Sequence, residues 1–279
     1  MREYSSKISL IKNSRGIYIL DTSIGCAAGM KETKGGCYGD CYAAKSANQY
    51  GYDFTKTKLR HFQNKKHERE IVFQISKIKL DFVRIGGSGD PSENWEHCIN
   101  VLKVIANCNK QIVIITRHWT NLSDEQLQFL NTINVCVNTS VSALDSNKLI
   151  SNSLEQYKRL KPYCKSVLRI VSCDFNLENE EGKRLSEIQH ELFKNENTLD
   201  TIFRPAKNNH FVASGIVNIK VGIFNGHKAI ISKFNKKTFA GKCSSCIEMC
   251  GVNIGKQKLK KPIYTQALLF NKKTKQNAI

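Results

Sequence analysis

The 279-residue chain lacks a long hydrophobic run. No apolar stretch approaches the ~18 residues that cross a bilayer, and residues 1–7 are polar, unlike the basic and apolar start of a secretion signal. We therefore expect no membrane partner and a cytoplasmic location. Acidic residues are also scarce, at 24 against 43 Lys and Arg, which gives a formal net charge of +19.

Arginine is the minor basic residue, since it supplies only 10 of those 43 positions. Lysines scattered along a chain usually form a solvated surface, whereas clustered basic side chains neutralise phosphates. The charge therefore leaves nucleic acid open as a partner without requiring it. The lysines are densest in residues 256–279, which we expect to be a Lys-rich tail.

Cysteine, in contrast, is abundant, with 11 residues. Three thiols lie on one Gly-rich loop and three more lie within eight residues near the other end: Cys26, Cys37 and Cys41, then Cys243, Cys246 and Cys250. In a reducing compartment, cysteines grouped in this way hold metal more often than they form disulfides. The sequence therefore predicts two metal-binding groups. A structural metal without chemistry is the alternative for the first group.

Short β-rich runs alternate with helix-compatible stretches through the first three quarters of the chain. The β-rich runs cover residues 17–20, 82–85, 112–116, 135–141, 166–171 and 201–203. The amphipathic stretches cover residues 42–75, 93–106, 124–130, 146–160 and 180–193. This order predicts an α/β fold with a parallel sheet. Six βα units fit a partial (β/α)6 TIM-like barrel better than a closed eight-stranded barrel, which takes roughly 250 residues.

The pattern changes after Pro205. Residues 211–217, 219–224 and 228–234 are predicted as short antiparallel strands, and Asn225-Gly226 between the last two is a hairpin turn signal. We therefore expect three parts: a barrel over residues 1–205, a β-hairpin and cysteine module over 206–255, and the tail over 256–279.

The first cysteine loop follows the first strand, and a Gly-rich turn, residues 86–90, follows the second. In α/β folds the carboxyl ends of the strands form the edge where ligands bind. Glycines there let a ligand approach the main chain, and Ser88 or Asp90 could hold an ammonium group. Arg117 and His118 end the third strand at the same edge.

With these two loops the chain resembles the radical S-adenosylmethionine (radical SAM) superfamily, including compact phage-type members that share the ending Cys41-Tyr42-Ala43. The resemblance, over about residues 17–205, implies a [4Fe-4S] cluster on the first three cysteines, reductive cleavage of S-adenosylmethionine (SAM) at the open iron, and flavodoxin or ferredoxin as electron donor. The chain departs from the usual Cys-x3-Cys-x2-Cys spacing, because ten residues separate Cys26 from Cys37 and three separate Cys37 from Cys41. Ser88 also stands where the family often has Glu.

The resemblance further implies SAM contacts at the ends of several strands. They are Gly86, Gly87, Ser88 and Asp90 for the amino group, and Asn138, Ser140 and Arg169 for the rest of the molecule. Arg169 also stands out physically, since a guanidinium in an apolar strand needs an anion. That anion is either a ligand or a carboxylate of the core.

The second cysteine group could hold an auxiliary [4Fe-4S] cluster or a structural zinc. Cys173, His210 and His227 are candidates for its fourth ligand, while Cys98, Cys108, Cys136 and Cys164 are expected to be ordinary buried side chains. The sequence thus predicts a radical SAM enzyme acting on an unidentified substrate. The alternative is a non-catalytic iron-sulfur or zinc-stabilised protein that binds nucleic acid in a salt-dependent manner.

Overall fold

The computed structural model describes residues 4–33, 35–242 and 245–254. Its centre is a seven-stranded sheet with the order β1-β2-β5-β6-β7-β8-β10. The strands are β1 (Leu10–Lys12), β2 (Tyr18–Leu20), β5 (Phe82–Ile85), β6 (Gln111–Thr116), β7 (Val135–Val141), β8 (Lys165–Ser172) and β10 (Thr198–Ile202). All neighbours pair in parallel except β1, which runs antiparallel to β2.

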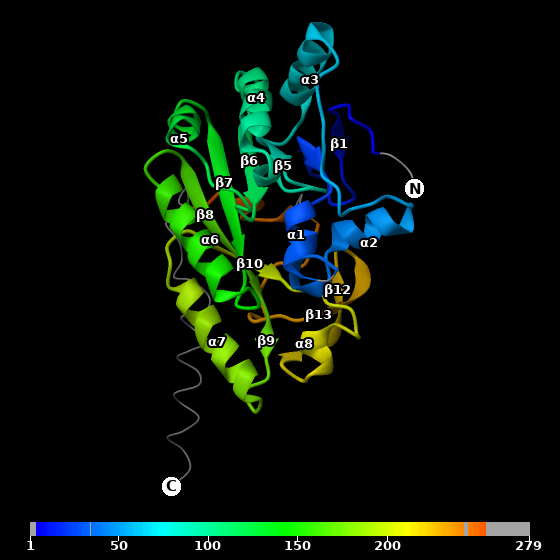
Figure 1. The fold of residues 1–279 in the computed structure, drawn as a ribbon, viewed down its shortest axis with the longest axis vertical. Coiled ribbons are helices and arrows are strands. Elements are labelled where there is room, and N and C mark those ends of the chain that lie inside the picture. Colours follow the sequence, from blue (N-terminus) through cyan, green and yellow to red (C-terminus); the bar gives the residue numbers. More distant parts are fainter. Residues whose placement is uncertain (1–3, 34, 243–244, 255–279) are drawn as a thin grey trace.

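Helices cover the outer face of this sheet (Figure 1). They are α3 (Lys65–Lys77), α4 (Trp95–Ile105), α5 (Asp124–Asn131), α6 (Asn147–Leu160) and α7 (Glu180–Phe193). Each begins after an Asn or Ser whose side chain accepts a backbone N–H of the first turn, which fixes where the helix starts. Within the described ranges, no helix combines the length and the apolar character that crossing a bilayer requires.

The inner face of the sheet is covered by the end of the described chain. Phe82 of β5, Val113 of β6 and Val167 of β8 pack with Val252 in one apolar cluster. Just before Val252 lies η4 (Met249–Gly251), which contains one cysteine of the second group. The second cysteine group therefore lies against the inside of the sheet.

Shorter elements complete the described chain. They are β3 (Ser23–Ile24), α1 (Ala27–Glu32), η1 (Cys37–Gly39), α2 (Tyr42–Gln49), β4 (Lys58–Leu59), η2 (Pro91–Glu93), β9 (Asp174–Phe175), α8 (His210–Ala213), β11 (Val217–Asn218), β12 (Lys220–Phe224) and β13 (His227–Ile231). β3 pairs with β4, β11 with β9, and β12 with β13. In Figure 1, α1, α2 and the β12–β13 hairpin lie on the opposite side of the view from α5, α6 and α7.

The predicted α/β class and the mostly parallel sheet are confirmed. The hairpin turn is also found, with Asn225 and Gly226 both at positive φ. The predicted strand over residues 211–217 is wrong. The Asn209 side chain accepts the N–H of Phe211 and starts the short helix α8, so only Val217 and Asn218 form a strand. The predicted tail, residues 256–279, lies outside the described residues.

Candidate functional site

The first cysteine loop sets each of its thiols at the start of a helical turn. Cys26 precedes α1, Cys37 opens η1, and Cys41 precedes α2. Backbone N–H groups at the start of a helix carry partial positive charge, which favours the thiolate over the thiol. For Cys26 and Cys37, burial outweighs this effect.

The three thiols of this loop are neighbours in space. The Cys37 thiol lies within electrostatic reach of both Cys26 and Cys41. Burial raises the pKa of Cys37 to about 11, against the opposing effect of Arg117, and burial also raises the pKa of Cys26. Without a metal both side chains are neutral thiols at pH 7, so metal binding there would release protons.

The arrangement does not fit a single metal ion. In the part of the chain that the structure describes, no three Cys, His, Asp or Glu side chains are grouped so that they could hold one. A lone zinc needs all its ligands around one centre, whereas the cysteines of a [4Fe-4S] cluster bind separate irons. The same finding holds for the described thiols of the second cysteine group, and a cluster at the first loop stays a prediction.

The Gly-rich turn after β5 lies directly against the cysteine loop. Gly25 and Gly89 form a parallel β-bridge, and the Gly25 N–H donates to the Ser88 carbonyl over 3.2 Å. The adjacency expected from the sequence is thus present. The packing of the protein itself requires glycine at position 86. Its φ is +88°, and an added Cβ would lie 2.3 Å from the Ile115 carbonyl oxygen of β6.

Asp21, directly after β2, is a residue that the sequence reasoning missed. Its two carboxylate oxygens accept the backbone N–H groups of Gly87 and Ser88 over 2.6 and 3.1 Å. Burial raises the pKa of this carboxyl. Asp21 therefore fixes the turn that we predicted to contact SAM, and it occupies two of the turn's backbone donors. A lone acidic residue ending an apolar strand was the signal available in the sequence.

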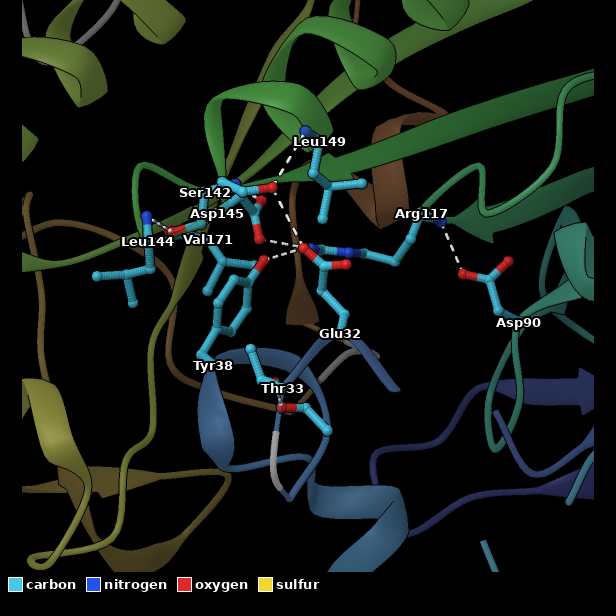
Figure 2. Close-up of polar contacts among 12 residues, drawn as sticks. Glu32, Thr33, Tyr38, Asp90, Arg117, Ser142, Leu144, Asp145, Leu149 and Val171 are labelled. Carbon is cyan, nitrogen blue, oxygen red and sulfur yellow. Dashed lines mark hydrogen bonds and ion pairs between the residues drawn. The ribbon is translucent and has the colours of Figure 1, made fainter. Parts of the chain in front are cut away.

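Asp90 is bonded within the protein. It accepts the N–H and hydroxyl of Ser92 over 2.9 and 2.7 Å, the hydroxyl of Thr116 over 2.7 Å, and the N–H of Arg117 over 2.7 Å. Figure 2 shows the last of these contacts. Asp90 thus braces the turn after β5 against the end of β6, and its contact with a SAM amino group stays a prediction.

Arg117 is held beside Cys37 by two further residues that the sequence did not reveal. Its guanidinium donates to the Tyr38 hydroxyl and to Asp145, and it lies 5.0 Å from the centre of the Tyr38 ring. Asp145 also accepts the N–H of Ser142 over 2.7 Å (Figure 2). A buried, paired cation next to Cys37 would offset negative charge on thiolates at this edge.

The predicted SAM contacts on later strands lie farther along the inner face. Ser140 is opposite Arg169 in the β7–β8 register, and Arg169 lines a cavity with Cys246 and Cys250. Asn138 donates to the Cys250 carbonyl over 3.0 Å. The structure therefore brings Asn138 and Arg169 to the second cysteine group, and their role in SAM binding stays a prediction.

The second cysteine group has a thiol neighbour that we had expected to be an ordinary core residue. Cys243 lies outside the described residues, but Cys136 of β7 is within electrostatic reach of Cys250. Asn138 connects them, because its amide nitrogen lies 3.7 Å from the Cys136 sulfur and also bonds the Cys250 carbonyl. The Cys173 side chain instead packs with Tyr38, Phe175 and Phe203 in a separate apolar cluster, so Cys136 is the better-placed fourth thiol.

Comparison of the chain with protein-family models gives no match, and comparison with curated proteins also gives none. The function must therefore be argued from the geometry of the site itself.

Proposed function

We propose that this chain is a radical SAM enzyme built on a partial (β/α)6 barrel. A [4Fe-4S] cluster bound by Cys26, Cys37 and Cys41 would cleave SAM reductively and start radical chemistry on its substrate. The observation that carries the proposal is the meeting of three neighbouring thiols with a Gly-rich turn, through the Gly25–Gly89 bridge. They meet at the carboxyl edge of a parallel sheet, where α/β folds bind ligands.

The surrounding residues suit such a site. Cys26 and Cys41 stand at the starts of α1 and α2, and Arg117, paired with Asp145, lies beside Cys37. Cys26 is only 8% exposed, which limits access of water and oxygen to this side of the loop. When bound, the cluster and SAM supply the one-electron cleavage chemistry, and a flavodoxin or ferredoxin supplies the electron.

The second cysteine group would hold an auxiliary [4Fe-4S] cluster or zinc. Cys246 and Cys250 belong to it, together with Cys243, and the neighbouring Cys136 completes a set of four thiols. Four cysteines satisfy either group, because both tetrahedral zinc and a [4Fe-4S] cluster accept four thiolates.

The test is the low-temperature electron paramagnetic resonance spectrum of anaerobically reconstituted, dithionite-reduced protein, recorded with and without SAM. We expect a [4Fe-4S]⁺ signal that shifts when SAM is added, and 5′-deoxyadenosine among the products. Cys37→Ser should remove both the shift and the product. Cys108→Ser is the matched control, because Cys108 lies outside both groups, and its thiol packs in the apolar core and donates to the Lys110 carbonyl over 3.9 Å.

Two results would contradict the proposal. A cluster signal that does not change when SAM is added would show that no iron is open to SAM. Formation of 5′-deoxyadenosine by Cys37→Ser would show that Cys37 is not a required cluster ligand. Bound zinc without iron, combined with steeply salt-dependent binding of nucleic acid, would favour the metal-stabilised nucleic-acid-binding protein instead.

A further inference from the structure

A cavity on the inner face of the sheet lies apart from the first cysteine loop. Counted to its open mouth it holds about 650 Å³. Its lining includes Ile17 next to β2, Arg84 of β5, Arg169 of β8, and Leu199 of β10. Strands from both ends of the sheet order therefore face one shared space, whose enclosed part is small, about 80 Å³.

The cavity has an excess of positive charge. Four arginines line it, and they come from four separate segments of the chain: Arg15, Arg84, Arg169 and Arg204. Its lining contains two carboxylates, Asp200 and Glu248. The formal balance is four positive charges against two negative ones, an excess of two.

Asp200 is also committed to other partners. Its two oxygens accept the hydroxyls of Ser172 and Thr238. The carboxylate that lies on the cavity wall is therefore already held by neutral donors. Guanidinium groups that share a poorly hydrated space repel one another, and an anion between them removes that cost.

Aromatic rings hold two of the arginines in place. Arg15 and Arg204 lie over the Phe224 ring, with guanidinium carbons 4.9 and 4.3 Å from its centre. Arg204 also lies 5.8 Å from the centre of the Tyr42 ring. Stacking uses the faces of the guanidinium groups, so it restricts their motion while N–H groups on their edges can still donate. The pKa of Arg204 is lowered, first by partial desolvation and then by repulsion from Arg15, with Arg169 adding to the effect.

We propose that this cavity binds the phosphate group of a phosphorylated ligand. A phosphomonoester carries about −1.5 to −2 charges at pH 7, and the lining keeps a positive excess even when Asp21, which acts on Arg84, is counted with Asp200 and Glu248. The planar fork of a guanidinium also fits two phosphate oxygens at once. Arg204 is exposed at the mouth, whereas Arg84 is buried, so the ligand would enter past Arg204 and the Phe224 ring. This binding does not depend on SAM cleavage.

The first experiment titrates the full-length protein with inorganic pyrophosphate by calorimetry at constant ionic strength. We expect saturable binding that the double variant Arg15→Gln/Arg204→Gln weakens about 10-fold to 100-fold. Arg184→Gln is the matched control, because Arg184 is an exposed arginine on α7, paired with Glu181, and has no part in the cavity. This control should bind pyrophosphate as the wild type does.

Competition then separates the two sources of phosphate. Displacement of pyrophosphate by a mononucleotide alone would assign the site to a free phosphorylated metabolite. Displacement by a ten-nucleotide single strand as well, with an affinity that falls as salt rises, would assign it to a nucleic-acid backbone. Either result supports the phosphate site.

Four results would overturn the proposal. They are equal pyrophosphate affinity in the wild type and the double variant, displacement by chloride at equal ionic strength, stoichiometric displacement by SAM, and loss of binding once iron or zinc occupies Cys246 and Cys250. The last would make the metal–thiolate group itself the anion of the cavity. Formation of 5′-deoxyadenosine by the wild-type protein is measured separately, so failure of the phosphate site is distinguishable from failure of the proposed function.

Discussion

His118 is a buried histidine whose ring the fold keeps uncharged. It is fully buried at the end of β6, and one ring nitrogen lies 3.0 Å from the Thr139 hydroxyl. The other, Nδ1, has no hydrogen-bond partner among the described residues. Burial lowers the pKa of His118 from its ordinary value of 6.5 to about 3, so the folded protein holds the ring neutral in mildly acidic solution.

Acid should therefore destabilise the fold through this residue. Unfolded chains take up a proton on His118 near pH 6.5 and folded chains only near pH 3, so this contribution is complete above pH 6.5 and is lost as the pH falls from 6.5 toward 3. The loss should reach a few kcal/mol, which urea unfolding at pH 7, 6, 5 and 4 would measure. His118→Asn suits the positive φ of this position and should flatten the dependence, whereas the exposed His227→Asn should leave it unchanged. Equal slopes in both variants would contradict the buried neutral ring.

The sequence predicted which loops form the candidate site. It did not predict which groups each side chain there would bind. The order of strands put Ser88 and Asp90 beside the cysteine loop, and the Gly25–Gly89 bridge confirms that neighbourhood. Two of the four hydrogen bonds of Asp90, from Thr116 and Arg117, depend on where β6 ends relative to β5. That register is set by long-range pairing, so no local pattern revealed that Asp90 supports the fold.

At the scale of the elements, Gly86 sets how closely the end of β5 approaches β6. Replacing it with alanine puts a Cβ 2.3 Å from the Ile115 carbonyl oxygen, in a backbone conformation with φ of +88°. Gly215 is a matched control, since its φ is +70° and an added Cβ would meet nothing within 4 Å. We expect Gly215→Ala to cost about 1 kcal/mol of unfolding free energy, from backbone strain alone. Gly86→Ala should cost about 3 kcal/mol or more, because the clash with backbone adds to the strain.

Chemical denaturation of the two glycine variants in parallel measures this difference. Similar losses for both would show that β6 yields to the added methyl group and that the contact is not tight. A large loss for Gly86→Ala alone would explain this glycine by the packing of two strands. Its predicted SAM contact would then need separate support from SAM titration of the folded fraction.

The elements that the sequence predicted well are those with strong local signals. The strands over residues 82–85 and 135–141 appear with the predicted bounds, because continuous β-branched and apolar runs mark buried parallel strands. The edge strand β1 was not predicted, since its short antiparallel pairing with β2 leaves no such run. Residues 211–217 contain apolar side chains that suggested a strand. The Asn209 cap just before them instead starts the helix α8.

At the scale of the whole molecule, the end of the described chain packs back onto the central sheet. Met249 to Ile254 pack on the inner face of the sheet, so the second cysteine group and the arginine-lined cavity share that face. The cysteine spacing predicted that these thiols bind one metal group, but it carried no information on where they pack in the fold. The two cysteine groups thus lie on different parts of one sheet, the first loop at its carboxyl edge and the second group on its inner face.

This docking is testable by a pair of identical substitutions. Val252 is 2% exposed and packs with Phe82, Val113 and Val167, whereas Val221 on β12 is 69% exposed. Val252→Ala should lower the free energy of unfolding by about 2 kcal/mol, because two buried methyl groups are lost and the rigid strands around them cannot collapse fully into the space. Val221→Ala should change it by less than about 1 kcal/mol, the range of strand propensity. Urea unfolding of both variants compares them directly. If the two losses are equal, residues 249–254 do not close the core, and the cavity would lose the wall that they provide.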